Sequence, residues 1–170
     1  MSERIRVKIG TPPHSDKQKL IMNAFFIPGL IEMWVACGSK FGKTFAASSA
    51  ISLAFPLKQQ ALWRWVAPIY TQSKIGFKYC KRMLPPEPYV RPNESNLSLS
   101  IPAIDSQIQF FHGQHPESLE GEATAGNILD ECAKMKEGVY ESAKTTTTVT
   151  RGPIIGISTP KGKKIGRAHV

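Results

Sequence analysis

The stretch from Gly38 to Thr44, Gly-Ser-Lys-Phe-Gly-Lys-Thr, has the residue types and spacing that can hold a triphosphate. Its glycines allow the backbone to curl, so that several N–H groups can point inward at a phosphate. Lys43 can then reach the β- and γ-phosphates, and the Thr44 hydroxyl can bind Mg²⁺. The sequence therefore predicts an ATP-binding loop made by Gly38, Ser39, Lys40, Phe41, Gly42, Lys43 and Thr44.

The spacing of this loop differs from the common G-x-x-x-x-G-K-[ST], because the first glycine stands one place later, at Gly38. A Gly-Lys-Thr tripeptide also occurs by chance, so the prediction depends on the flanking elements. Residues 31–36 contain a continuous apolar run typical of a buried strand. Residues 43–53 predict a helix, whose N-terminal end would face the phosphates. Strand before and helix after are the context that a phosphate-binding loop requires.

A pair of carboxylates, Asp130 and Glu131, follows the apolar stretch Gly-Asn-Ile-Leu, 87 residues after Lys43. A strand that ends in this pair places both carboxylates at the carboxyl edge of a parallel sheet, beside the phosphate loop. Asp130 would hold Mg²⁺, directly or through water. Glu131 would polarise the water that attacks the γ-phosphate. Taken alone, the stretch Ile-Leu-Asp-Glu is also typical of the solvated start of a helix.

A third candidate is the end of an expected strand over residues 153–158, where Ser158 and Thr159 precede Pro160. Their hydroxyls could lie next to the γ-phosphate and couple hydrolysis to the rest of the protein. The alternative is an ordinary junction between a strand and a turn.

The elements expected between these motifs alternate, which indicates an α/β domain with a mostly parallel central sheet flanked by helices. The strands are expected at residues 31–36, 62–67, 127–129 and 153–158, with a hairpin over 97–101 and 107–111. The helices are expected at residues 15–26, 43–53, 71–84 and 138–147, with Leu20, Ile21, Ala24 and Phe25 on one face of the first. The proline-rich residues 85–96 are expected to form a loop.

Composition sets limits on the partners of the chain. Lys and Arg outnumber Asp and Glu by 22 to 13, and the resulting charge of +9 suits a polyanion such as nucleic acid or simply favours solubility. The cluster Lys74, Lys78, Lys81 and Arg82 leaves the same two interpretations open. Neither a membrane-spanning run nor a secretory signal is recognised, so an intracellular protein is expected. The three cysteines have no metal-like spacing.

Residues 165–170 follow a lysine-rich loop, and their pattern indicates no structural element. Our hypothesis is that they are a sequencing artefact and that the natural protein continues beyond about Lys164. Genuine codons for these six residues in the source DNA would contradict it.

Together the three motifs resemble the terminase large subunit family of tailed bacteriophages and related viruses, over about residues 15 to 163. Lys40 stands where that family often has a basic residue, and Gln18 is similar to its adenine-reading glutamine. Ser158-Thr159-Pro160 matches its coupling motif. Further stretches that look like family segments are Trp65 to Gln72, Ile108 to Gly113 and Glu117 to Gly121.

The resemblance implies a P-loop NTPase fold of the ASCE type, with ATP and Mg²⁺ as cofactors. It implies a motor that drives double-stranded DNA into a viral capsid in the host cytoplasm. Such subunits form a ring, usually a pentamer, on the portal protein, and a small terminase subunit selects the genome. Residues 1–164 would then be an ATPase domain that is incomplete at its C-terminal side, without the family's nuclease domain. Its catalytic residues would be Lys43, Lys40 and Glu131.

One departure from the family concerns Glu120, which stands where an arginine finger is often found. A carboxylate cannot stabilise the negative charge of a transferring phosphate. Arg82, Arg91 and Arg151 are possible substitutes, and Lys40 could act within its own site. The sequence does not choose among them.

Two other functions fit parts of the pattern. A helicase motor of the DEAD/DEAH type shares the phosphate loop, the glutamine and the acidic pair. It tends to continue with Ala/Cys-His/Asp and later with Ser-Ala-Thr, where this chain has Cys132-Ala133 and Ser158-Thr159-Pro160. A non-catalytic ATP-binding scaffold would bind ATP without turnover, but such a scaffold has no need of Glu131.

Overall fold

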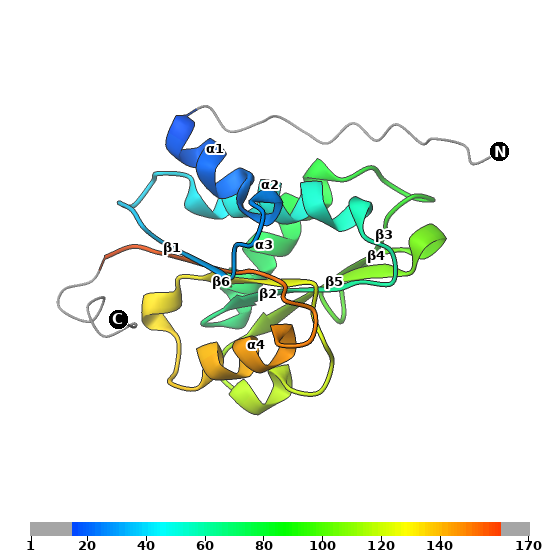
Figure 1. The fold of residues 1–170 in the computed structure, drawn as a ribbon. Helices are drawn as coiled ribbons and strands as arrows, with labels where there is room; N and C mark the ends of the chain where they lie inside the picture. Colours follow the sequence, from blue (N-terminus) through cyan, green and yellow to red (C-terminus); the bar gives the residue numbers. More distant parts are fainter. Residues whose placement is uncertain (1–14, 161–170) are drawn as a thin grey trace.

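The computed structural model describes residues 15–160 and contains one seven-stranded sheet over that range, in the order β1-β7-β6-β2-β5-β4-β3 (Figure 1). The strands from β1 through β7, β6 and β2 to β5 are parallel, and β4 and β3 complete the sheet as antiparallel strands. Their bounds are β1 (Glu32–Ala36), β2 (Leu62–Ala67), β3 (Arg91–Asn93), β4 (Ser98–Ile101), β5 (Ser106–His112), β6 (Gly126–Asp130) and β7 (Ile154–Ser158).

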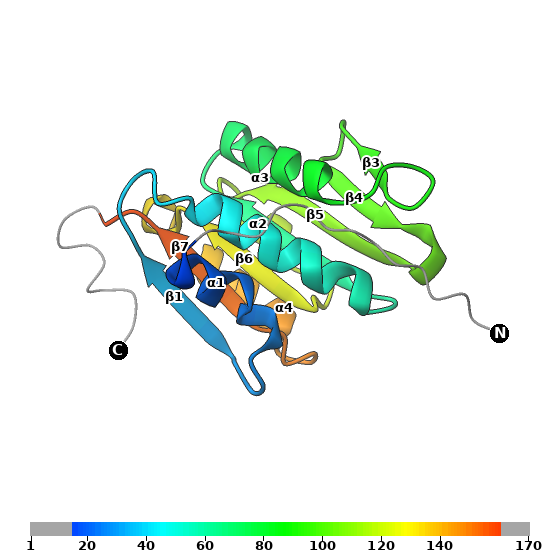
Figure 2. The same cartoon turned by 90° about the horizontal axis from the view of Figure 1, so that it is seen from above.

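Helices cover both faces of this sheet. Figures 1 and 2 show α1, α2 and α3 on one face and α4 on the other. Their bounds are α1 (Asp16–Met22), α2 (Lys43–Ala54), α3 (Tyr70–Met83) and α4 (Val139–Thr147). Short 3₁₀ turns are η1 (Ala24–Phe26), η2 (Phe55–Leu57), η3 (Pro102–Ile104), η4 (Pro116–Leu119) and η5 (Cys132–Lys134). The predicted fold class, an α/β domain with a mostly parallel sheet between helices, is confirmed.

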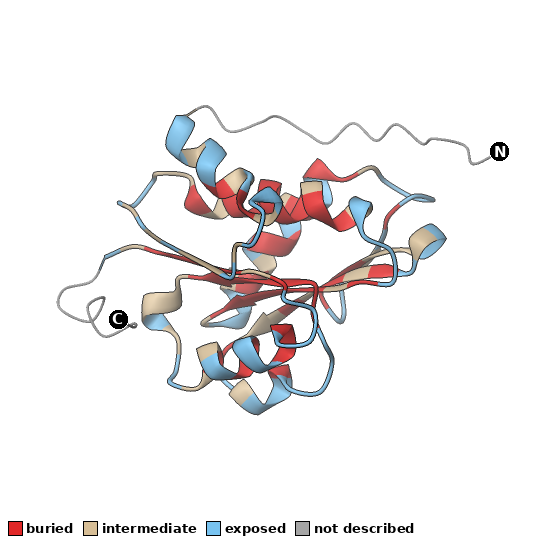
Figure 3. Cartoon of the chain, in the orientation of Figure 1, coloured by how far each residue is buried: buried red, intermediate tan, exposed pale blue. Residues whose placement is uncertain are grey.

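The core has two layers because neighbouring residues of a strand face opposite sides of the sheet. Trp65 and Ile128 pack with α2 and α3, whereas Val66 and Leu129, one residue further along the same strands, pack with α4. Each fully buried large side chain of this kind stabilises the fold by about 1.5–3 kcal/mol. Figure 3 shows the buried residues concentrated in the central strands and on the helix faces against them.

The strand β1 differs from the expectation of a buried strand. It lies at one edge of the described sheet and pairs with β7 alone, so Trp34 is 39% exposed. Trp34 lies opposite Gly156 of β7, and a Cβ at Gly156 would meet its ring at 2.1 Å. The Trp34 ring therefore occupies the space that a side chain at position 156 would fill. Trp63 and Trp65, by contrast, are buried on the central strand β2.

Smaller corrections concern the expected loop and the first helix. Residues 85–96 include β3, which pairs with β4 and extends the predicted hairpin. Leu20 is exposed, because α1 contacts the molecule through Ile21 and the following Ala24. Within the described residues, no helix is long and apolar enough to cross a membrane. Residues 161–170, where the artefact and the domain end are expected, lie outside the described residues.

Candidate nucleotide-binding site

The three motifs meet because three neighbouring parallel strands end at the same edge of the sheet. Ala36, the last residue of β1, pairs with Ser158 of β7, and Asp130 of β6 pairs with Ile157. The loop after β1, the carboxylates after β6 and the hydroxyls after β7 are therefore side by side. In open α/β sheets this carboxyl edge is where ligands bind.

The loop between β1 and α2 is fixed at both ends. The Cys37 N–H donates to the Ser158 carbonyl at 3.0 Å, and the Ala46 N–H donates to the Gly42 carbonyl at 2.9 Å. Gly42 precedes the helix with φ +80°, a left-handed conformation that glycine adopts without a steric penalty. Gly38, Ser39 and Lys40 form the exposed outer part of the loop.

Gln18 reaches this loop from α1. Its side-chain nitrogen donates to the Phe41 carbonyl at 2.8 Å, and a Cβ at Gly42 would meet that nitrogen at 2.6 Å. The same side chain closes a capping box with Ser15, which begins the helix. The residue expected to read adenine is thus placed against the inner end of the phosphate loop.

Lys43 is a buried cation at the first position of α2, with 8% of its surface exposed. Its Nζ lies 2.8 Å from Glu131 Oε1 and donates to Thr159 Oγ1 at 2.8 Å. The Thr159 hydroxyl in turn donates to Glu131 Oε1 at 3.3 Å. One residue from each motif therefore takes part in a single hydrogen-bonded cluster.

Thr44 and Asp130, the two residues expected to hold Mg²⁺, are in direct contact. The Thr44 hydroxyl lies 3.2 Å and 3.3 Å from the two Asp130 carboxylate oxygens. Burial raises the pKa of Asp130 to about 6, although the hydrogen bond from Thr44 acts in the opposite direction. A buried carboxylate beside a hydroxyl offers the hard oxygen ligands that Mg²⁺ prefers, with the remaining ligands left to water and phosphates.

Glu131 lies at the centre of the cluster, with 14% of its side chain exposed. Its second oxygen, Oε2, lies 3.1 Å from Nζ of Lys134, a residue that the sequence analysis did not single out. Burial acts to raise the pKa of Glu131, but hydrogen bonds from Lys43 and Lys134 outweigh it and hold the pKa below its usual value. The spacing of three residues between Glu131 and Lys134 is the only sequence signal for this pair.

Ser158 has a different position from its neighbour Thr159. Its hydroxyl accepts a hydrogen bond from the Ala133 N–H at 3.2 Å, so it holds the turn that follows Glu131 rather than the lysine. Of the two residues expected to couple hydrolysis to the protein, Thr159 therefore contacts Lys43 and Glu131, and Ser158 contacts the turn beside them.

The candidates for an arginine finger lie away from this edge. Arg82 is near the end of α3, Arg91 begins β3, and Arg151 precedes β7, so all three lie toward the opposite edge of the sheet. The two edges are separated by a strand length, roughly 16 Å for five residues. Glu120 is exposed beside α4, where it accepts from the Ser142 hydroxyl at 3.5 Å.

Arg64 is a second residue that no sequence motif indicated. It is buried on β2 and holds the segment that contains Glu120. Its guanidinium donates to the Leu119 carbonyl and lies 3.9 Å from a Glu122 carboxylate oxygen. It also lies over the Phe111 ring, 5.4 Å from the centroid. An arginine within an apolar strand is the sequence signal that could have identified this contact, since buried charges need partners.

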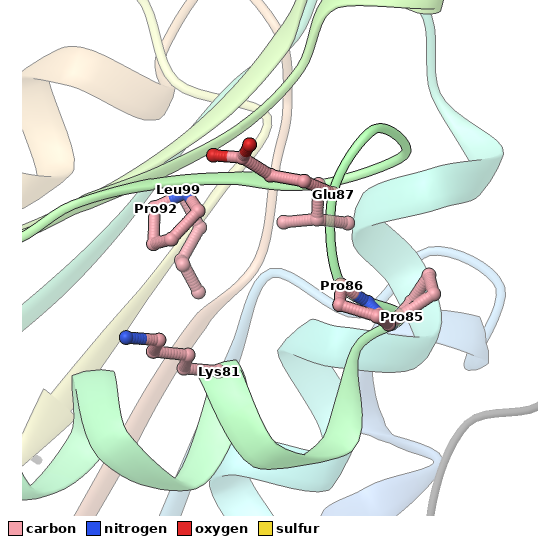
Figure 4. Close-up of a pocket in the computed structure, with 7 residues that line it drawn as sticks. Lys81, Pro85, Pro86, Glu87, Pro92 and Leu99 are labelled. Carbon is pink, nitrogen blue, oxygen red and sulfur yellow. The ribbon is translucent and has the colours of Figure 1, made fainter.

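A separate hollow of about 280 Å³ lies near the end of α3 (Figure 4). Pro85, Pro86, Val90, Pro92 and Leu99 give it a mostly apolar lining, with Lys81 and Glu87 beside them. Because α3 starts at the carboxyl edge of β2 and runs back along the sheet, its end lies away from the nucleotide site.

Comparisons with known proteins identify the fold. No family model matches the sequence, and no curated protein matches it. The ATPase domain of the Thermus phage P74-26 large terminase matches with a TM-score of 0.70 and 25% identity, over 91% of this chain and 67% of that domain. The large terminase of a thermophilic bacteriophage, in complex with ADP, matches with a TM-score of 0.70 and 20% identity, over 87% of this chain. The HK97 bacteriophage large terminase matches with a TM-score of 0.73 and 18% identity, over 89% of this chain.

This chain spans 39% of the ADP-bound terminase and 34% of the HK97 protein. The similarity therefore concerns only part of each of those two proteins. Over that part, the expectation drawn from the motifs is confirmed: the chain has the P-loop fold of the ATPase domain of bacteriophage large terminases.

Proposed function

We propose that this chain is the ATPase motor domain of a terminase large subunit, which hydrolyses ATP with Mg²⁺ to drive double-stranded DNA into a viral capsid. The observation that carries the proposal is the convergence of Lys43, Glu131 and Thr159. These residues come from three distant parts of the sequence and lie within 3.3 Å of one another. The large terminase of the thermophilic bacteriophage has been crystallised with ADP and with ATP-γ-S, which supports a nucleotide as the ligand of this fold.

We assign the following roles to residues at this edge of the sheet. Lys43 would exchange Glu131 and Thr159 for the β- and γ-phosphates, and the loop N–H groups with the start of α2 would hold the other oxygens. Thr44 and Asp130 would hold Mg²⁺, which neutralises charge on the phosphates. Glu131, released from Lys43, would accept a proton from the attacking water. Lys40 and Gln18 are assigned to the triphosphate and the adenine by resemblance alone.

The partners that we propose follow from the same assignment. They are double-stranded DNA, the portal protein, the small terminase subunit and further copies of this chain in a ring, in the cytoplasm of the host cell. The charge of +9 favours contact with a DNA backbone. Since Arg82, Arg91 and Arg151 lie toward the other edge of their own sheet, each could serve only the ATP of a neighbouring subunit.

The proposal is tested by ATP binding and hydrolysis in two variants. Lys43→Ala should lose ATP affinity, because it removes the cation that contacts the phosphates. Glu131→Gln should keep ATP but lower turnover by about 100- to 10,000-fold, the usual contribution of a general base. Both quantities are measured with a fluorescent ATP analogue and a phosphate-release assay. Equal turnover in wild type and Glu131→Gln would refute the assigned base. ATP binding without any turnover in the assembled wild-type ring would instead favour an ATP-binding scaffold, since the ring supplies any arginine that acts on a neighbour's ATP.

A further inference from the structure

Two lysines hold Glu131, and they contact different oxygens of its carboxylate. Lys43 Nζ lies 2.8 Å from Oε1, and Lys134 Nζ lies 3.1 Å from Oε2. The Thr159 hydroxyl also contacts Oε1, at 3.3 Å. Lys43 and Thr159 therefore meet at Oε1, whereas Oε2 has the ion pair with Lys134 as its charged contact.

The two lysines differ in what else they must do. Lys43 is almost buried in the phosphate loop, and in the proposed function it moves to the phosphates when ATP binds. That exchange removes the cation from Oε1 and leaves this oxygen open to a water molecule. Lys134 follows Glu131 in the chain, outside the phosphate loop, and 35% of its side chain is exposed. Its contact with Oε2 does not involve Lys43, so the movement of Lys43 does not require this contact to break.

The backbone around Lys134 is fixed rather than loose. The Lys134 N–H donates to the Glu131 carbonyl at 2.9 Å, which closes the turn η5. The neighbouring Ala133 N–H donates to the Ser158 hydroxyl at 3.2 Å, which fastens this turn to the end of β7. Glu131 itself has φ +54°, a left-handed conformation that is unfavourable for a residue with a side chain. The surrounding contacts hold the backbone of Glu131 in this conformation.

We propose that Lys134 is a positioning residue for the ATPase reaction. It holds Glu131 through Oε2 so that Oε1 faces the phosphates, and the turn that carries Lys134 is fastened to the end of β7 at Ser158. The inference rests on the proposed function, since it needs Glu131 to be the base. The simpler interpretation is an ion pair between residues three apart in the chain, which adds little to stability and nothing to the reaction.

Steady-state ATP hydrolysis separates these two interpretations. Lys134→Met should lower kcat about 10- to 100-fold with KM nearly unchanged, because a misplaced base slows the reaction without weakening phosphate binding. Lys134→Arg keeps a cation within reach of Oε2 and should recover most of this loss. Lys136→Met is the matched control: Lys136 lies two residues further on, and its Nζ donates to the Gln114 carbonyl at 2.9 Å instead of to Glu131. This control should have the kcat of the wild type.

A double variant excludes a general loss of structure. In the Glu131→Gln background, Lys134→Met should cause no further loss of turnover, and thermal unfolding should show that every variant is folded. A wild-type kcat in Lys134→Met overturns the inference, as does a fall in ATP affinity that accounts for the whole effect. A wild-type protein that neither binds nor hydrolyses ATP overturns the proposed function as well, whereas an active wild type with an insensitive Lys134→Met overturns the inference alone.

Discussion

The protonation of Asp130 links the candidate site to the stability of the fold. Asp130 is 3% exposed, and burial raises its pKa to about 6 despite the Thr44 hydrogen bond. In the unfolded chain an aspartate has a pKa of about 4. Between these two pH values the folded state binds more protons than the unfolded state, so the free energy of unfolding falls as pH rises through this window.

Replacement of Asp130 by asparagine should therefore stabilise the chain at high pH. In the absence of Mg²⁺ and nucleotide, we expect Asp130→Asn to raise the free energy of unfolding by about 1–3 kcal/mol at pH 8, because it removes a buried charge but keeps an acceptor for Thr44. The difference should shrink as pH falls from 6 toward 4. Urea unfolding at several pH values measures it, and a variant less stable than wild type at pH 8 would contradict the prediction.

The residues of this site could be predicted from the sequence only where a short motif carries them. Lys43, Thr44, Asp130 and Glu131 belong to stretches with characteristic neighbours, and the structure brings them together. Lys134 and Arg64 belong to no such stretch. Their contacts depend on a turn fastened to β7 and on the segment beside α4. The signals that the sequence does contain, a spacing of three residues and an arginine within an apolar strand, do not identify the partner of either residue.

Among the elements, α3 depends on a glycine for its approach to the sheet. A Cβ at Gly76 would meet the Trp65 ring at 2.5 Å, and Trp65 is fully buried on β2. The ring therefore lies directly under the helix backbone. Any side chain at position 76 would separate the two elements or displace the tryptophan.

We expect Gly76→Ala to lower the free energy of unfolding by about 1–3 kcal/mol through this overpacking, even though alanine is the better helix former by about 1 kcal/mol. Chemical denaturation measures the change. Lys78→Ala, on the exposed side of the same helix, is the control and should stay within about 0.5 kcal/mol of the wild type. A stabilised Gly76→Ala would show that helix propensity outweighs the contact with Trp65.

The existence of most elements could be predicted, but their places in the sheet could not. The ranges expected for β2, β6 and β7 agree with the structure within a residue or two, because apolar runs bounded by turn residues mark buried strands. The run in β1 has the same character, yet it lies at the sheet edge with Trp34 half covered. The order of strands is set by long-range pairing, which a local pattern does not encode.

For the whole molecule, nucleotide binding and global stability are linked. A ligand that binds only the folded state stabilises it by about 2.7 kcal/mol at a concentration of 100 times Kd. For a domain of this size, this corresponds to roughly 5–10 °C in Tm. We expect ATP with Mg²⁺ to raise the Tm of wild type and Glu131→Gln by this amount. Lys43→Ala should show little change at the same ATP concentration, and an equal shift in this variant would argue against the phosphate loop as the binding site.

If Gln18 reads adenine, as the resemblance implies, its hydrogen bonds place a condition on base selectivity. Its carbonyl oxygen already accepts from the N–H and the hydroxyl of Ser15, both at 3.1 Å, and its amide nitrogen donates to Phe41. An adenine edge presents one donor and one acceptor. If Gln18 bonds to both, its side-chain oxygen must give up a hydrogen bond to Ser15 in the first turn of α1. Each hydrogen bond between Gln18 and Ser15 is worth about 1 kcal/mol. Losing one would reduce by that amount the free energy with which the site prefers adenine over other purines. A purine that binds there would loosen the start of α1 while the triphosphate tightens the loop at its other side.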